Sequence, residues 1–427
     1  MNRDSKIRLF DLIACLSDAM DFIDPAVVSH HQQVASIACR IGMEMALPSE
    51  ELKDIVLAGA LHDIGAFSLK ERRDILAFEM ENPHPHAEKG YALLRFFKPL
   101  ANVAPMIRCH HLPWNHGSGA EFNGERVPFG GHILHLADRL AVLIQKKDEV
   151  LSQIPSVCRK IREETDKMFM PDVVDAFNNL ASKEYFWLDI MSPSLQTGLS
   201  QTFKQATIGL TSEDMMSFSR LFSKIIDFKS SFTATHSSGV SAVAVRLSRL
   251  LGFTEADCRL MQIAGYLHDL GKLAVPSEIL EKPSGLKDNE FNVIRHHTYY
   301  TYRILETIPQ FQVINKWASF HHERLDGSGY PFHLTSKDLP RGSQVMAVSD
   351  VFTAITENRP YRQGMTRTSA IKVLDRMAQD SALSKEIVAV LKANYNEINT
   401  ARMHAQASAS TDYECLSEQC HPVVNEA

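Results

Sequence analysis

Two stretches of eight residues, "AGALHDIG" at residues 58–65 and "AGYLHDLG" at residues 264–271, occur one in each half of this 427-residue chain. Each contains an adjacent histidine and aspartate, and a glycine follows after one further residue. A glycine at this place is typical of the end of a helix. We therefore expect each His-Asp pair to lie at a helix end, with Gly65 and Gly271 as the C-terminal stops.

The spacing of the other histidines is also repeated in the two halves. A first histidine stands equally far before the His-Asp pair in both halves, and a later histidine stands equally far before a His-His pair in both. The interval from that pair to a last aspartate differs between the halves by a single position. Internal similarity of this kind indicates a duplicated domain. The two sets are His30, His62, Asp63, His86, His110, His111 and Asp138, and His236, His268, Asp269, His297, His321, His322 and Asp350.

The apolar pattern predicts an all-α fold. After His236, Val240, Val243 and Leu247 recur at helical spacing, and Gly252 is expected to stop this helix. We expect two tandem helical bundles joined by helical connectors, with the first domain at 1–200 and the second at 201–402. Residues 403–427 show no helical periodicity, so a flexible tail is predicted there.

The composition is that of an ordinary globular protein, with 44% hydrophobic and 22% charged residues and a net charge of -6. Because of this charge, we expect no binding to duplex nucleic acid. The sequence has no stretch of about 18 apolar residues, so we expect no membrane span. None of the seven cysteines forms a Cys-x-x-Cys pair. A reduced, cytoplasmic location without a thiolate metal site is expected, and a homodimer is left open.

Each repeated set consists of imidazoles and carboxylates, which suit iron, manganese, nickel or zinc. Seven ligands exceed the needs of one tetrahedral ion and suit two divalent ions, with an aspartate able to bridge them. Two ions can clamp a phosphate ester, activate a water molecule and stabilise the leaving oxygen. Outside these sets, a surface or core role is expected for His84, His116, His132, His135, His296 and His333.

Three stretches in the second half, "HDLGKLAVP" (268–276), "HHERLDGSGYP" (321–331) and "SDVFTAITENRPYR" (349–362), resemble the HD-GYP branch of the HD metal-dependent phosphohydrolases. The resemblance covers about Ser230 to Gly364. It implies an all-helical fold, a cytoplasmic signalling role in bacteria, and hydrolysis of 3',3'-cyclic dinucleotides to linear 5'-phosphorylated products. The tandem arrangement makes 3',3'-cyclic GMP-AMP a candidate substrate beside cyclic di-GMP.

The resemblance implies a role for each matching residue of the second half. The seven residues of the set would hold metal, Asp269 and Lys272 would be catalytic, and Lys272 would contact the scissile phosphate. Arg359 and Arg362 would hold the dinucleotide. Two departures are visible. No acid stands at 232–235, where some members of the family hold a third metal, so two ions are expected. Thr353 replaces a common aspartate.

The first half is a worn copy. Ala66 stands at the position of Lys272, and "HHLPWNHGSGA" (110–120) lacks the Tyr-Pro ending. The retained set leaves three interpretations open: a metal site that hydrolyses a phosphomonoester, a nucleotide-binding regulator, or a structural and dimerisation module. For the whole chain, the alternatives to a diesterase are a catalytically silent cyclic-dinucleotide receptor and a general HD-type nucleotidase.

Overall fold

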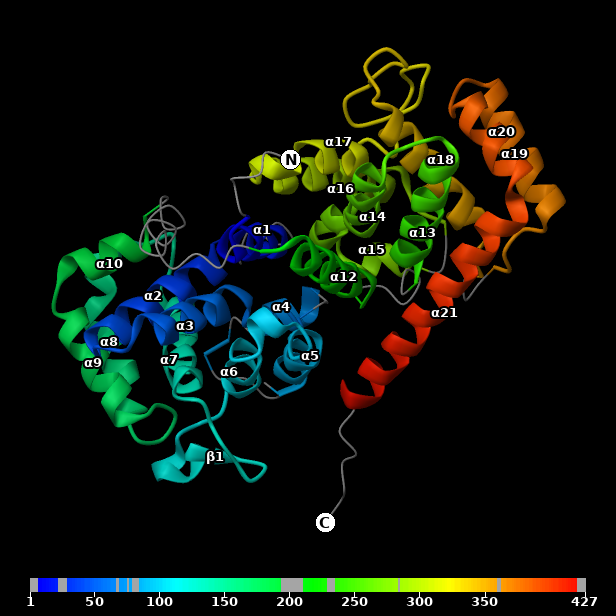
Figure 1. Cartoon of the computed structure of the whole chain (residues 1–427). Coiled ribbons are helices and arrows are strands. Elements are labelled where there is room, and N and C mark those ends of the chain that lie inside the picture. The colour runs from blue at the N-terminus through cyan, green and yellow to red at the C-terminus, as the bar shows by residue number, and fades with distance from the viewer. Residues whose placement is uncertain are drawn as a thin grey trace. The chain divides into compact units, whose positions relative to one another are not determined.

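The computed structural model describes residues 7–21, 29–66, 69–74, 77–78, 84–192, 210–228, 235–282, 285–358 and 362–420 (Figure 1). The chain divides into two compact units, one within Arg8–Gly209 and the other within Leu210–Glu418. The all-α fold is confirmed, because the described strands are limited to the antiparallel pair β1 (Glu121–Phe122) and β2 (Glu125–Arg126). Among the described helices, none combines the length and the apolar character needed to cross a membrane.

Ten α-helices and two short 3-10 helices are described in the first unit. They are α1 (Leu9–Asp21), α2 (His30–Glu44), α3 (Ser49–Leu61), α4 (Leu69–Asp74), α5 (His84–Leu94), η1 (Lys98–Leu100), α6 (Val103–Cys109), η2 (Asn115–Ala120), α7 (Phe129–Leu143), α8 (Val150–Glu163), α9 (Pro171–Ala181) and α10 (Glu184–Ile190).

The described part of the second unit has a similar order of helices. They are α12 (Ser212–Phe228), α13 (His236–Leu250), α14 (Glu255–Leu267), η3 (Leu270–Ala274), α15 (Ser277–Leu280), α16 (Asp288–Glu306), η4 (Pro309–Phe311), α17 (Gln312–Ser319), α18 (Arg341–Thr356), α19 (Arg367–Gln379), α20 (Lys385–Ala393) and α21 (Tyr395–Cys420).

Local signals in the sequence set several helix boundaries. The hydroxyl of Thr254 accepts a hydrogen bond from the backbone N–H of Asp257 at 3.1 Å and so caps the start of α14. As predicted, α13 ends just before Gly252, whose φ of +80° is the left-handed conformation that favours glycine at a helix end. Apolar residues of these helices, such as Val240, Val243 and Leu247, are completely buried between them.

The two helices that carry the first histidine and the His-Asp pair cross at very short range in each unit. A Cβ atom added at Gly265 of α14 would lie 2.5 Å from the Cα atom of Ser241 in α13. The equivalent glycine of the first unit, Gly59, would place a Cβ atom 2.7 Å from the Cα atom of Ala35. The repeated Ala-Gly dipeptide therefore lets each His-Asp pair approach the helix that begins with the first histidine.

The predicted flexible tail at 403–427 is wrong over its described part, because α21 continues to Cys420. Contacts with other helices hold α21: Glu397 pairs with Arg246 of α13, and Asp412 pairs with Lys224 of α12 at 2.8 Å. Ile398 is completely buried. Tertiary packing therefore stabilises a segment whose own pattern is weak. Residues 421–427, and the predicted domain junction near residue 200, lie outside the described residues.

The close crossing predicts that Gly265→Ala lowers the stability of the second unit. Alanine favours a helix by about 1 kcal/mol relative to glycine. The added methyl group nevertheless meets the backbone of Ser241, and such overpacking costs about 1–3 kcal/mol. Urea unfolding followed by circular dichroism measures the change. Gly285→Ala is the matched control, since a Cβ atom there meets nothing within 4 Å. Equal stability of the two variants would contradict the close-packing explanation.

Candidate metal centres

The structure brings the seven predicted ligands of the second half together within one unit. His236 is the first residue of α13, His268 and Asp269 directly follow α14, and His297 lies in α16. His321 and His322 follow α17, and Asp350 lies in α18. Five different helices therefore each supply one or two donor groups. Ligand-sized subsets are close enough to share an ion, among them His236, His268 and Asp350, and His297, His321 and His322.

Most histidines of this site are oriented by their own helices. The Nδ1–H group of His268 donates to the carbonyl oxygen of Gly265 at 2.8 Å. His297 and His321 donate in the same way, at 2.6 Å each, to the residue three positions earlier. A carbonyl oxygen only accepts, so Nδ1 carries the proton in each ring and Nε2 presents a lone pair to the interior. This arrangement is typical of histidines that bind metal through Nε2.

Two of these lone pairs face each other. The Nε2 atoms of His297 and His321 lie 3.3 Å apart. Burial lowers the pKa of His297 to about 3 and also lowers the pKa of His321, so both rings are neutral at pH 7. Neither Nε2 can donate to the other, and a cation between them would remove the repulsion. Nε2 of His268 is also buried and makes no hydrogen bond to any described residue. These observations fit a metal ion.

The carboxylates complete the site. Asp269 places its two oxygens on different histidines, Oδ1 at 3.4 Å from Nε2 of His297 and Oδ2 at 3.2 Å from Nε2 of His268. Asp350 Oδ1 lies 3.1 Å from Nε2 of His236. Burial opposes the charge of Asp269, but His268 and Lys272 hold its pKa well below its usual range. An ionised carboxylate whose two oxygens face different ligands is suited to bridging two ions.

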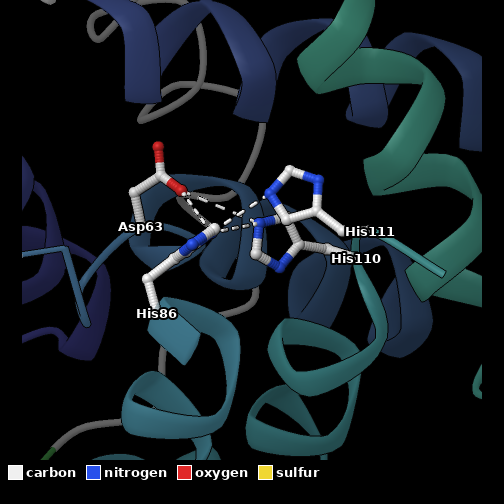
Figure 2. A group of neighbouring side chains, drawn as sticks. All are labelled: Asp63, His86, His110 and His111. Atoms are coloured by element: carbon white, nitrogen blue, oxygen red, sulfur yellow. Dashed lines mark hydrogen bonds and ion pairs between the residues drawn. The ribbon is translucent and has the colours of Figure 1, made fainter. Parts of the chain in front are cut away.

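The first unit repeats this arrangement with its own set. Asp63 lies 3.3 Å from Nε2 of His86 through Oδ1 and 3.1 Å from Nε2 of His62 through Oδ2. Nε2 of His86 lies 3.4 Å from Nε2 of His110 and 3.1 Å from Nε2 of His111, and Figure 2 shows these rings converging with Asp63. Asp138 lies 3.2 Å from Nε2 of His30. Both oxygens of Asp63 are buried without a hydrogen bond to a described residue, which again fits a metal ion.

The two sites differ in access. In the second unit the side chains of His322 and Lys272 are 31% and 18% exposed. In the first unit the side chain of His111 is only 4% exposed, and Ala66, at the position of Lys272, is completely buried. Catalytic metal sites keep an open position, whereas structural ones are closed. The second site therefore has the access that a substrate needs.

A buried arginine adds to the closure of the first site. Arg139 places Nη2 at 2.5 Å from Oδ2 of Asp138, and its Nη1 donates to the carbonyl oxygen of Ala77. The corresponding residue of the second unit is Val351, so the ligand Asp350 has no such neighbour in sequence. One oxygen of Asp138 is thus already engaged by a protein cation.

Gly65 and Gly271 have a different role from the predicted one. The helices end at Leu61 and Leu267, and neither glycine is among those with positive φ, so they are not left-handed helix stops. A Cβ atom at Gly271 would lie 1.9 Å from the carbonyl oxygen of His297, and one at Gly65 would lie 2.1 Å from that of His86. The glycine lets the His-Asp segment pack against the helix that carries the next ligand.

The predicted substrate-binding residues are placed in part. Lys272 lies 2.6 Å from Oδ2 of Asp269, directly beside the candidate metal ligands. Arg362 is exposed, and its Nη2 donates to the carbonyl oxygen of Ala354 at 2.5 Å. Arg359 lies outside the described residues. Thr353 is completely buried against Gly239, so it replaces the common aspartate as a core residue.

Several residues near the second site were not predicted. Glu357 is buried, with its oxygens 3.1 and 3.2 Å from Nδ1 of His236. Asp227 of α12 is also buried and accepts a hydrogen bond from Ser237 at 2.9 Å, and burial raises its pKa to about 8. Tyr330 lies with its ring 5.0 Å from that of His322, and the guanidinium of Arg295 lies 4.8 Å from the Tyr330 ring centre. Glu357 and Tyr330 stand within the quoted motifs, which is the signal that could have found them.

The histidines expected to serve surface or core roles are placed in different ways, and the ring of His135 lies edge-on to that of the candidate ligand His111, with 6.1 Å between the ring centres. His116 is exposed and pairs with Asp166 at 2.8 Å. His132 and His135 are buried, and burial lowers their pKa to about 4 and about 3 respectively. His135 donates through Nδ1 to the carbonyl oxygen of Leu112 at 3.1 Å, so it has a partner within the core.

Comparisons with known proteins agree with the internal duplication. Residues 27–143 and residues 220–386 each match the HD domain family. Each match spans one complete set of seven candidate ligands. The expected resemblance to tandem HD and HD-GYP proteins is confirmed.

Two relatives match along nearly the whole chain. The 3'3'-cGAMP-specific phosphodiesterase 1 of Vibrio cholerae is 29% identical over 405 residues, which cover 92% of this chain and 93% of the relative. The 3'3'-cGAMP-specific phosphodiesterase 3 of the same organism is 25% identical over 443 residues, 91% of this chain and 95% of the relative. A cyclic di-GMP phosphodiesterase of Pseudomonas aeruginosa is 40% identical over 149 residues, 35% of each chain.

A solved structure shares the fold. The crystal structure of a cyclic GMP-AMP-specific phosphodiesterase of Vibrio cholerae aligns with a TM-score of 0.64 and 22% identity, over 92% of this chain and 98% of that chain. At this identity the likeness concerns the architecture.

The geometry predicts that each unit binds metal through its own His-Asp pair. His268→Ala combined with Asp269→Ala should remove the metal bound by the second unit, and His62→Ala combined with Asp63→Ala should remove that of the first. Metal content per chain, measured by plasma mass spectrometry after dialysis, checks both. His116→Ala is the control, because this exposed histidine lies outside both sets. Unchanged metal content in both double variants would contradict the assignment.

Proposed function

We propose that this tandem HD-domain protein is a metal-dependent phosphodiesterase that hydrolyses 3',3'-cyclic dinucleotides to linear 5'-phosphorylated dinucleotides. The second unit carries the reaction, and 3',3'-cyclic GMP-AMP and cyclic di-GMP are the candidate substrates. The observation that carries the proposal is the open second site. There the neutral rings of His297 and His321 face each other, and the carboxylate of Asp269 lies between these ligands and the half-buried Lys272. The two Vibrio cholerae phosphodiesterases named above, which match this chain along more than nine-tenths of its length, support it.

The metal would be held by His236, His268, Asp269, His297, His321, His322 and Asp350. We propose two divalent ions of iron, manganese or nickel, because imidazole-rich sites with carboxylates suit these metals. When bound, they would supply Lewis-acid chemistry for phosphate-ester hydrolysis. The protein holds the donor groups in position through backbone hydrogen bonds, so little reorganisation is needed on binding.

Lys272 is proposed to act on the substrate. Its ammonium group lies 2.6 Å from Asp269 and remains 18% exposed, so it can reach a phosphoryl oxygen placed beside that carboxylate. A fixed cation at this place stabilises the charge that develops on the phosphoryl group as the ester bond breaks. The exposed Arg362, and Arg359, are proposed to bind the dinucleotide, whose phosphates and guanine edges suit arginine.

The first unit is proposed to bind metal without hydrolysing cyclic dinucleotides. Its candidate ligands are buried, Ala66 stands in place of the lysine, and Arg139 engages Asp138. A phosphomonoesterase acting on the ring-opened product is the alternative for this unit. A role in cytoplasmic signalling in bacteria, and a homodimer, remain expectations from the sequence.

The proposed function predicts turnover of cyclic dinucleotides by metal-loaded protein. Incubation with 3',3'-cyclic GMP-AMP and with cyclic di-GMP, followed by chromatography, should show a linear product with a 5'-phosphate from at least one. Lys272→Met should lower kcat about 10²–10³-fold, the usual effect of removing one group that stabilises transition-state charge. Arg303→Met serves as the control, because Arg303 pairs with Glu306 on the exposed surface of α16. Substrate binding without turnover of either compound would support a receptor instead.

The two interpretations of the first unit predict different phosphate release. If this unit only binds metal, His62→Ala combined with Asp63→Ala leaves ring opening at the wild-type rate, and neither protein releases inorganic phosphate from the linear product. This is the result we expect from the buried site. A colorimetric phosphate assay on the purified linear product checks it. Phosphate release by the wild-type protein that the double variant lacks would instead identify a phosphomonoesterase.

A further inference from the structure

We infer that the C-terminal helix α21 is part of the second metal site. Through Gln406 and Arg402, it holds Glu357 against His236 and so fixes the ring of this ligand. Glu357 and Gln406 are thus positioning residues that act on the metal through His236. This inference rests on the proposed function for its catalytic consequence, but its geometry and its effect on metal binding do not depend on which substrate is hydrolysed.

His236 cannot be oriented in the way that the other histidines are. His268, His297 and His321 each donate Nδ1–H to the backbone carbonyl three residues earlier, a carbonyl that belongs to their own helix. His236 is the first residue of α13, so no earlier residue of this helix offers such a carbonyl. A ring at this position needs an acceptor from elsewhere in the fold.

Glu357 supplies that acceptor from a distant part of the chain, just beyond the end of α18. Its two oxygens lie 3.1 and 3.2 Å from Nδ1 of His236, while Nε2 of the same ring lies 3.1 Å from Oδ1 of Asp350. The ring therefore lies between two carboxylates. In the proposed metal-bound site, Nδ1–H would donate to Glu357, and Nε2 would bind the ion beside Asp350, as in the carboxylate-histidine pairs that orient metal ligands.

Residues of α21 hold the carboxylate in turn. Nε2 of Gln406 donates to Oε2 of Glu357 at 3.1 Å, and Arg402 donates to Oε1 of Gln406. Arg402 also donates through Nε to Asn399 at 3.0 Å. Arg402 and Glu357 are 6% and 4% exposed and Gln406 is half-buried, so two of the three members of this hydrogen-bonded chain are shielded from solvent. Hydrogen bonds at such depth are costly to break.

The packing of α21 agrees with this role. Gln406 packs against Gly239, which lies one turn after His236 in α13. A Cβ atom added at Gly239 would lie 3.0 Å from the side-chain amide of Gln406. The described part of the first unit has no acid at the equivalent position. The position of Glu357 is occupied there by Gln145, which is exposed, and whose backbone N–H donates to Gln153 at 2.8 Å. Among the described residues, this arrangement is therefore found at the open site.

The test compares metal binding by variants of metal-free protein. Glu357→Gln weakens the acceptor, and Gln406→Met removes the amide while keeping the length of the side chain. Both should weaken binding of Mn²⁺ to the second site by about 10–100-fold in isothermal titration calorimetry, which is typical for the loss of such a partner. Their kcat for the cyclic dinucleotide should fall with little change in KM, because neither residue is proposed to touch substrate.

Glu397→Gln is the matched control. It removes the ion pair with Arg246 that also joins α21 to α13, but it does not touch Glu357. Its Mn²⁺ affinity should stay within about twofold of the wild type, although its melting temperature falls. Equal loss of Mn²⁺ affinity in Glu397→Gln and Gln406→Met would reduce the effect to helix docking and overturn the inference. Wild-type Mn²⁺ affinity in Glu357→Gln would also overturn it.

The two proposals can fail separately. If wild-type protein turns over no cyclic dinucleotide but Glu357→Gln and Gln406→Met still lose Mn²⁺ affinity, the proposed function fails and the positioning role stands. If the wild type is active and both variants bind Mn²⁺ normally, the positioning role fails and the function stands.

Discussion

The hydrogen bond from Nδ1–H of a histidine to a backbone carbonyl of its own helix is the interaction on which both sites depend. In the first unit His62 and His110 make it to the carbonyl oxygens three residues earlier, at 2.8 and 2.6 Å. The last carbonyls of a helix lack partners within the helix, and His268 and His321 each satisfy one of them just beyond a helix end. The same bond fixes the tautomer, so Nε2 has no proton to offer and points inward. Helix capping and ligand orientation are thus one event, which explains why the motif stands at the ends of short helices.

Orienting many neutral imidazoles in this way has an electrostatic cost that the protein alone does not remove. Nε2 atoms face each other at 3.3 Å in the second unit and at 3.4 Å in the first. Only two aspartates per set supply compensating negative charge to a bound cation. The fold therefore favours a divalent metal in both units, and the difference between them must arise from what surrounds the ligands. One set includes a half-buried histidine and adjoins a lysine, whereas the other is buried and adjoins an alanine and a buried arginine.

The ligand sets could be predicted from sequence because two copies record the same spacing. A helix places its residues at fixed intervals, so the equal separations of the first histidine from the His-Asp pair in the two halves require matching helix geometry. Residues that contact distant parts of the chain show no repeated spacing in the sequence. Glu357 reaches back to His236 from beyond α18 and appears only in the second copy. The role of Gly271 was also missed, since a sequence does not reveal that a carbonyl oxygen from α16 would lie 1.9 Å from its missing Cβ atom.

The error about the C-terminal tail has the same origin as the missed acid. The segment from Met403 onward is rich in alanine, serine and acidic residues, so its apolar stripe is too weak to predict a helix. Within this segment, polar contacts with distant parts of the chain are made by Gln406 with Glu357 and by Asp412 with Lys224 of α12. A helix held by polar contacts is specific about where it docks, because each unpaired buried group would be costly. That specificity is what allows a carboxylate beside a metal ligand to be held by a helix near the end of the chain.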